Sequence, residues 1–120
     1  LSLPALAQTR FRASGHAIGI LKTGPLNAIT DVPDVRVGHV TLRQGDSVRT
    51  GVTVVVPHGG NAFPPKVAAA VFVGNGFGKM TGLSQIAELG NLETPVVLTN
   101  TLSVAAGIEG LVTHTLAQPG

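Results

Sequence analysis

The sequence predicts a mixed α/β (α+β) fold in which strands are followed by helices. Two runs rich in β-branched residues, separated by turn-forming residues, predict strands in the first half of the chain. Near the C-terminus the apolar residues instead recur about every three to four positions, which is typical of a helix. A strand-to-helix crossover is expected over residues 96–116, and it would place at least one helix against a sheet.

The first strand pair is predicted to be a hairpin. Residues 35–42 alternate apolar and polar side chains, residues 44–47 supply turn chemistry, and residues 52–56 are nearly continuous valine. A continuous apolar strand of this kind is expected where both faces of the sheet are covered.

A second strand and a short helix are expected after the break at residues 57–61. Residues 67–73 form an apolar run that predicts a strand. Residues 82–89 then predict a helix, with Thr81 as its N-cap and Gly90 at its stop position.

The last strand and helix are expected at residues 95–99 and from Asn100 or Thr101 onward. Gly107 and Gly110 each weaken a helix by about 1 kcal/mol unless another element packs closely on them, so we expect a crowded, buried helix. Its expected apolar face consists of Val104, Ile108, Leu111, Val112 and Leu116.

Composition and charge narrow the functional classes. The 120 residues are enough for one domain, and with 43% apolar but only 3% aromatic residues its core must be aliphatic. Because the chain has no cysteine, disulfides, thiolate ligands and thiol nucleophiles are excluded from it. The net charge of +2 is not concentrated in a basic cluster, so no nucleic-acid partner is expected. No stretch is long enough to span a membrane.

The first residues resemble the end of a secretory signal. Residues 1–7 end in Ala-Leu-Ala before the polar Gln8, which matches a small-x-small cleavage site after Ala7. We therefore expect residues 8–23 to be an N-terminal extension and the protein to be periplasmic or secreted. The alternative is an irregular N-terminus of a cytoplasmic protein that contains these residues by chance.

A glycine-rich loop is the most distinctive local motif. Gly74, Gly76 and Gly78 alternate with Asn75, Phe77 and Lys79, and such a loop can direct backbone N–H groups toward an anion or polar ligand. A nucleotide phosphate loop is disfavoured because Met80, not Ser or Thr, follows Lys79. The alternative is a tight turn whose glycines have positive φ angles.

The junction at Asn100 and Thr101 is a second candidate site. Free N–H groups at a helix start suit a carboxylate or an oxyanion, although simple capping of the helix by either residue is the favoured interpretation. Since both loops follow apolar strands, we expect Asn75 and Asn100 to lie on the same edge of one sheet.

Other polar residues do not form a recognisable catalytic or metal-binding pattern. The histidines are too far apart in sequence to suggest a metal site, and Asp31 and Asp34 are best explained as turn-capping residues. Ser84 and Ser103 lie outside any Gly-x-Ser-x-Gly motif and are expected in the first turns of helices. The four histidines are His16, His39, His58 and His114.

Several blocks of the chain together resemble a known family. They lie in order between residues 24 and 116, and include Asn-Ala-Ile-Thr-Asp-Val, Val-Arg-Val-Gly-His, Arg-Thr-Gly-Val-Thr, Asn-Gly-Phe-Gly-Lys and Leu-Thr-Asn-Thr-Leu-Ser. This series is similar to the N-terminal part of the L-aminopeptidase/D-esterase family, which includes the β-aminopeptidases. Residues 24–120 are accordingly identified as a partial N-terminal (α-chain) part of the aminopeptidase domain.

The resemblance implies a four-layer αββα sandwich and a precursor that cleaves itself once. The cleavage would free a serine at the N-terminus of a second polypeptide, where the serine is the nucleophile and its own α-amine helps as base. Family members release N-terminal amino acids from short peptides, amides and esters without a cofactor. The implied partners are such a substrate, the protein's own C-terminal β-chain and further copies in a homo-oligomer.

The family's central catalytic residues have no counterpart in this chain. It contains no tyrosine, and none of its 16 glycines precedes Ser, Thr or Cys, so it has no self-cleavage junction. We expect this chain alone to be inactive and its remaining role to be substrate binding. The alternatives are a non-catalytic small-ligand-binding domain and a self-processing enzyme of the ornithine acetyltransferase type. The candidate substrate-binding residues are Asn75, Gly76, Phe77, Lys79, Asn100 and Thr101.

Overall fold

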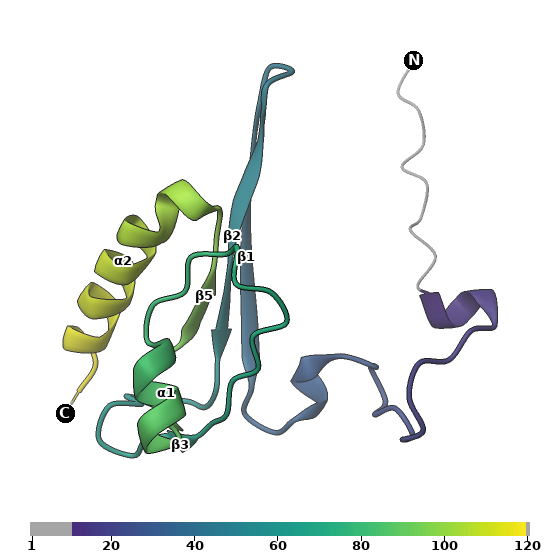
Figure 1. The fold of residues 1–120 in the computed structure, drawn as a ribbon, viewed down its shortest axis with the longest axis horizontal. Helices are drawn as coiled ribbons and strands as arrows, with labels where there is room; N and C mark the ends of the chain where they lie inside the picture. The colour runs from purple at the N-terminus through teal and green to yellow at the C-terminus, as the bar shows by residue number, and fades with distance from the viewer. Residues whose placement is uncertain (1–10, 120) are drawn as a thin grey trace.

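The computed structural model describes residues 11–119, which form two antiparallel sheets and two α-helices (Figure 1). The expected cleavage site at Ala7 lies outside the described residues. The larger sheet has the order β1-β2-β5 and the smaller pairs β3 with β4. The elements are η1 (Phe11–Ser14), η2 (Ile29–Asp31), β1 (Arg36–Gln44), β2 (Val48–Val56), β3 (Val67–Ala68), α1 (Leu83–Leu89), β4 (Asn91–Leu92), β5 (Val96–Leu98), η3 (Thr101–Ser103) and α2 (Val104–Leu116).

The predicted hairpin is confirmed, and both strands are longer than expected. β1 and β2 pair from Arg36 opposite Val56 to Gln44 opposite Val48. Directly opposed residues share a face, so the hairpin has an apolar side and a polar side. Val40 and Val52 oppose each other on the apolar side, whereas on the polar side the His39 Nδ1 and Thr53 Oγ1 atoms are hydrogen-bonded at 2.9 Å.

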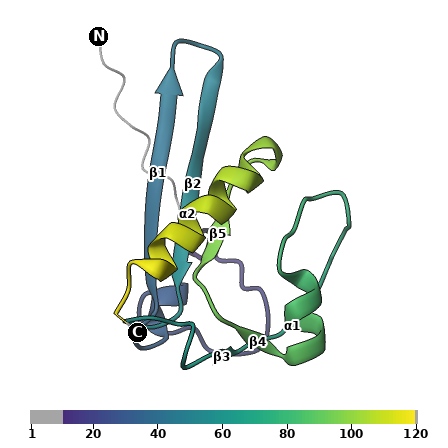
Figure 2. The same cartoon turned by 90° about the vertical axis from the view of Figure 1, so that its left-hand side faces the viewer.

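β5 confirms the strand predicted at residues 95–99 but covers only the base of the hairpin. It pairs with residues 53–55 of β2, and the distal half of the hairpin extends beyond it (Figures 1 and 2). The valines of β2 are therefore half-buried, and the expectation that both faces of this strand are covered is not met within residues 11–119.

The strand predicted at residues 67–73 is largely wrong. Only Val67–Ala68 form a strand, β3, opposite β4, and one further bond joins the Ala69 N–H to the Gly90 carbonyl at 2.9 Å. An apolar run becomes a strand only where a neighbouring strand bonds to its backbone. Residues 70–73 have no such neighbour among the described residues, and Phe72 is 91% exposed.

The helix predicted at residues 82–89 is confirmed as α1, but its N-cap is not Thr81. Gly82 occupies the cap position with a left-handed φ of 83°, and no side chain caps the helix. This left-handed residue separates Thr81 from the first turn. Gly90 does end the helix as predicted, with φ of 65° and its N–H donating to the Ile86 carbonyl.

α2 begins after a 3-10 turn that Asn100 caps. The Asn100 Oδ1 accepts hydrogen bonds from the N–H groups of Leu102 and Ser103, each at 3.1 Å. The capping interpretation is therefore confirmed for Asn100.

Only part of the apolar face predicted for α2 packs toward the sheet, where Leu111 is half-buried. Leu116 is 81% and Val112 is 51% exposed, whereas Gly107 faces β5. A Cβ atom on Gly107 would lie 3.4 Å from Val97 Cγ1, so the glycine lets the helix approach the strand closely. The expected close packing is thus confirmed at Gly107. It is not found at Gly110, where a Cβ atom would meet nothing within 4 Å.

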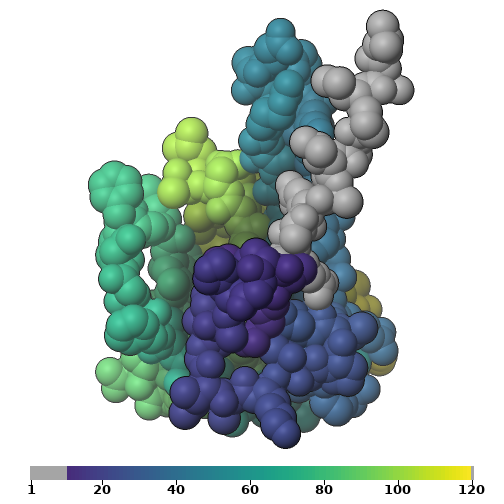
Figure 3. All heavy atoms as spheres, turned by 90° about the vertical axis from the view of Figure 1, so that its right-hand side faces the viewer, coloured from purple at the N-terminus to yellow at the C-terminus, as the bar shows by residue number. Residues whose placement is uncertain are grey.

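Packing is sparse throughout the described part of the chain. Ala62 is 6% exposed and Pro95 is also buried, but the large apolar side chains remain accessible. Phe77 and Leu102, for example, are 95% and 92% exposed. In Figure 3, residues 11–35, in purple to blue, form a lobe in the lower half of the view. The loop of residues 69–82 stands as a separate column to its left. The aliphatic side chains expected to form a core are therefore mostly exposed to solvent in this part of the chain.

The loop before β1 is organised around the carboxylate of Asp31. Its Oδ1 and Oδ2 accept hydrogen bonds from the N–H groups of Leu26 at 2.9 Å and Ala28 at 3.1 Å. Gly24 approaches so closely that a Cβ there would lie 2.5 Å from the Asp31 Oδ2. Turn capping is therefore confirmed for Asp31, while Asp34 occupies the left-handed region with φ of 66°.

We expect Asp31→Ala to expose the Ala28 amide. Removing a carboxylate that accepts two backbone N–H groups should reduce local stability by about 1–2 kcal/mol, which corresponds to roughly tenfold faster hydrogen exchange at Ala28. Asp46→Ala is the control, because Asp46 lies in the hairpin turn with only a 3.9 Å ion pair to Arg49. Equal exchange rates in the two variants would contradict the capping role of Asp31.

Candidate functional site

The glycine loop is an exposed connection between β3 and α1. Asn75 Oδ1 accepts a hydrogen bond from the Phe77 N–H at 3.3 Å, which turns the chain and presents Phe77 to solvent. The alternative of a turn with positive-φ glycines is wrong, because Gly74, Gly76 and Gly78 do not occupy the left-handed region. The glycines instead leave open space, since a Cβ at Gly76 or Gly78 would meet no atom within 4 Å.

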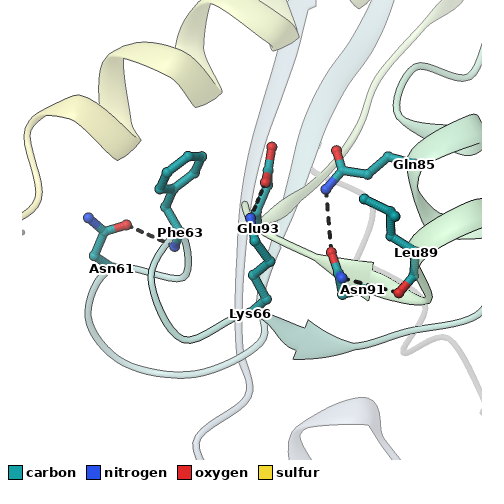
Figure 4. Close-up of polar contacts among 7 residues, drawn as sticks. All are labelled: Asn61, Phe63, Lys66, Gln85, Leu89, Asn91 and Glu93. Atoms are coloured by element: carbon teal, nitrogen blue, oxygen red, sulfur yellow. Dashed lines mark hydrogen bonds and ion pairs between the residues drawn. The ribbon is translucent and has the colours of Figure 1, made fainter.

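The segment that leads into this loop is held to β4 by an ion pair. Lys66 Nζ contacts the Glu93 carboxylate and lies 4.6 Å from the centroid of the Phe63 ring (Figure 4). The side chains of Lys66 and Glu93 are 39% and 30% exposed, so water partly screens the pair. The pair joins the residue before β3 to the residue after β4, and so it supports the pairing of these two strands.

The other end of the loop is held through α1. Asn91 Nδ2 donates to the Leu89 carbonyl at 3.1 Å, and its Oδ1 is 3.5 Å from Gln85 Nε2 (Figure 4). Together with the Gly90 cap, these contacts join α1 to β4. The glycine loop is therefore exposed, while the segments before and after it are held in place by these polar contacts.

Asn100 links the start of α2 to the hairpin. Its Nδ2 donates to Thr50 Oγ1 at 3.2 Å, while its Oδ1 caps the N–H groups of η3. Both ends of the amide are thus occupied by protein groups, and Thr101 is exposed beside it. The Asn100 side chain thus connects β2 to η3 by hydrogen bonds. The sequence alone did not indicate this connection.

The two candidate loops do not follow strands of one sheet, so that expectation is wrong. The glycine loop follows β3 of the two-stranded sheet, whereas Asn100 follows β5 of the three-stranded sheet. Figure 2 nevertheless shows the loop of residues 69–82 rising on the same side as the C-terminal end of β5 and η3. No hydrogen bond or ion pair joins Asn75–Lys79 to Asn100 or Thr101 in the described part of the chain, and their shared role in substrate binding stays a prediction.

An apolar groove lies between α2 and the apolar side of the β1-β2-β5 sheet, and it was not predicted from the sequence. Its volume is about 570 Å³, and Asn100 lies on its margin. Among its lining side chains His114 is the only titratable one. The small residues on one side of α2, Ala106, Gly107 and Gly110, are the sequence signal that could have indicated it. The other lining residues include Val40, Leu42, Val52, Val54, Val97 and Leu111.

The remaining polar residues are consistent with structural roles. Ser84 lies in the first turn of α1, as expected. Ser103 is the last residue of η3 and the N-cap of α2, so it precedes the first turn of that helix. Within residues 11–119 no three His, Asp or Glu side chains are grouped closely enough to hold a metal ion. None of the helices there is long and apolar enough to cross a bilayer.

Comparison with known proteins agrees with the family resemblance. The sequence profile of Peptidase family S58 matches residues 27–120. Beta-peptidyl aminopeptidase BapA of Sphingosinicella microcystinivorans is 43% identical over 91 residues, which cover 69% of this chain and 23% of that protein. BapA of Sphingosinicella xenopeptidilytica is 43% identical over 89 residues, with 68% and 22% of the two chains covered.

Two solved structures of similar proteins extend the agreement to the fold. The PH0078 protein from Pyrococcus horikoshii OT3 has a TM-score of 0.81 at 49% identity, over 88% of this chain and 32% of that one. A Burkholderia sp. β-aminopeptidase has a TM-score of 0.80 at 49% identity, over 88% and 31%. The chain thus spans about a quarter of the length of the curated relatives it matches. With its antiparallel sheets in a mixed α/β fold and a profile match over most of its length, the chain belongs to peptidase family S58.

Proposed function

We propose that this chain is the N-terminal part of a self-processing serine aminopeptidase that releases N-terminal residues from short peptides, amides and esters. The observation that carries this proposal is the family match over residues 27–120, with aminopeptidases among the relatives. It favours the aminopeptidase over an ornithine acetyltransferase-type enzyme and over a non-catalytic binding domain. The four-layer αββα sandwich belongs to the same proposal, for the longer polypeptide.

In this proposal the present chain supplies part of the substrate pocket and the rest of the polypeptide supplies the reacting groups. The exposed Phe77 offers an apolar contact, and Asn75 and Lys79 offer polar contacts on the same open loop. Thr101 would face the pocket from the start of η3, where Asn100 braces the chain. Nucleophile and base would come from a serine freed at the N-terminus of the second polypeptide, with no cofactor.

The cellular setting and the assembly are part of the proposal as well. The Ala-Leu-Ala sequence before Gln8 supports export to the periplasm or beyond, with a mature chain that begins at Gln8. The functional unit would combine this chain with its C-terminal β-chain and then associate into a homo-oligomer.

Self-cleavage tests the proposed function directly. We expect the longer S58 polypeptide that contains this chain to split into two fragments, the second beginning with serine, because the serine hydroxyl can attack its own preceding peptide bond. Gel electrophoresis and N-terminal sequencing of the second fragment measure this. The matched control replaces that serine with alanine and should remain one polypeptide. Release of nitroaniline from alanyl nitroanilide by the uncut control would show that the nucleophile is another residue.

A further inference from the structure

The backbone pairing of β2 with β5 ends before the chain reaches η3. The ladder runs from Val55 opposite Val96 to Thr53 opposite Leu98, and residues 50–52 and 99–101 lie beyond it. A side-chain hydrogen bond takes over at this point, because Asn100 Nδ2 donates to Thr50 Oγ1 at 3.2 Å. The start of η3 is therefore tied to the hairpin by one threonine hydroxyl.

The orientation of the Asn100 amide is fixed by its other partners. Its Oδ1 accepts hydrogen bonds from the N–H groups of Leu102 and Ser103, each at 3.1 Å. A backbone N–H can only donate, so the oxygen end of the amide must face η3 and the NH₂ end must face Thr50. The Thr50 hydroxyl thus holds the donor end of the same side chain whose acceptor end caps η3.

The hairpin side of this connection is the firmly placed side. Thr50 is half-buried and opposes Leu42 in the nine-residue ladder of β1 and β2. The next residue, Gly51, lies so close to β1 that a Cβ there would be 2.4 Å from the Val40 carbonyl oxygen. Because the strands are in such close contact here, Thr50 sets the position of Asn100 rather than the reverse.

The η3 side of the connection has little packing of its own. Thr101 is exposed, Leu102 is 92% exposed, and none of the three residues of η3 is buried. A segment with few buried contacts opens at low free energy unless hydrogen bonds hold it. The position of Thr101 therefore depends on the polar contacts of Asn100.

We propose that Thr50 is a positioning residue of the aminopeptidase, which holds η3 through Asn100 so that Thr101 contacts the substrate. This inference rests on the proposed function, in which Thr101 is part of the substrate pocket. Thr50 does not touch the substrate itself. Since a binding contact of this kind acts equally on the bound substrate and on the transition state, its loss raises KM and leaves kcat unchanged.

Removal of the Thr50 hydroxyl from the longer S58 polypeptide tests this proposal. Thr50→Val keeps the shape of the side chain, and we expect KM for alanyl nitroanilide to rise about tenfold while kcat changes by less than about twofold. Amide exchange at Leu102 and Ser103 should become about tenfold faster. Thr50→Ser restores the hydroxyl and should return both quantities to the wild-type values.

Thr53→Val is the matched control, because it removes another half-buried hydroxyl from the same strand. The Thr53 hydroxyl is bonded to His39 Nδ1 at 2.9 Å on the other side of the hairpin, so KM should not change. An equal rise of KM in Thr50→Val and Thr53→Val would mean that the stability of the hairpin is responsible, and would overturn the inference.

The kinetic constants also separate this inference from the proposed function. An active wild type with unchanged KM in Thr50→Val would overturn the inference alone, even if exchange at Leu102 becomes faster, because the bond would then be merely structural. A fall of kcat at constant KM would likewise contradict a role in substrate binding. A longer wild-type polypeptide without turnover would count against the proposed function, and the positioning role of Thr50 would fall with it.

Discussion

Residues 8–120 alone are expected to release nitroaniline from alanyl nitroanilide no faster than buffer, whereas the longer S58 polypeptide turns it over. Acyl transfer needs an activated nucleophile, a positioned base and an oxyanion site, and in the proposed function all three lie outside this chain. Loss of the nucleophile alone reduces serine peptidase turnover by about 10⁶-fold. The two polypeptides should therefore differ by at least that factor at equal concentration.

Two controls test whether the difference in turnover is due to the missing nucleophile. The longer polypeptide with its nucleophilic serine replaced by alanine should be as inactive as the short chain, which separates chemistry from substrate binding. Addition of the short chain to the active enzyme should not change the rate. Robust turnover by residues 8–120 would show that a serine or threonine of this chain, such as Ser84 or Ser103, is the nucleophile, and the proposed division of roles would be wrong.

Gly51→Ala is expected to disrupt the hairpin. A Cβ at this position would lie 2.4 Å from the Val40 carbonyl oxygen and 3.3 Å from the Thr41 Cα, and both are backbone atoms of the paired strand. The strands can accommodate the methyl group only by moving apart, at a cost of roughly 1–3 kcal/mol. The hydrogen-exchange protection of amides in β1 and β2 should fall accordingly, by about tenfold for each 1.4 kcal/mol.

Gly38→Ala is the matched control, because the same change is made in the other strand of the hairpin. A Cβ at Gly38 would meet no atom within 4 Å, and its φ is not positive. We expect alanine there to leave protection unchanged or to raise it slightly, since alanine reduces the freedom of the unfolded chain. Equal losses in both variants would mean that glycine is needed for its flexibility and not for the close approach to Val40.

Those parts of the fold that depend on local patterns could be predicted from the sequence. The hairpin follows from valine-rich strands around a Gly-Asp-Ser turn, and the end of α1 follows from Gly90. The strand predicted at residues 67–73 failed because pairing needs a partner, and the identity of that partner is not encoded in the run itself. The face of α2 that packs on the sheet was predicted only in part, since Leu111 lies on it but Val112 and Leu116 do not. The prediction counted only large apolar side chains, whereas the contact with β5 is made at Gly107, where the absence of a side chain lets the helix lie close to Val97.

The candidate site was predictable only in part. The sequence located the glycine loop and the start of the last helix, but it placed both on one sheet, whereas they follow strands of different sheets. It could not indicate that Asn100 reaches Thr50, because these residues are far apart in the chain and meet only through the pairing of β2 with β5. The groove was missed because its lining comes from four elements, β1, β2, β5 and α2, each of which has an ordinary composition.

The open apolar side of the hairpin has a consequence for synthesis on the ribosome. If the chain continues into a polypeptide about three times its length, as its solved relatives do, the downstream part takes on the order of 10–50 s to be made at ordinary elongation rates. During that interval Val40, Leu42 and the small residues of α2 lie on an exposed apolar surface. We therefore expect a chaperone to bind the nascent N-terminal part and to keep this surface away from other nascent chains until the rest of the polypeptide has been made.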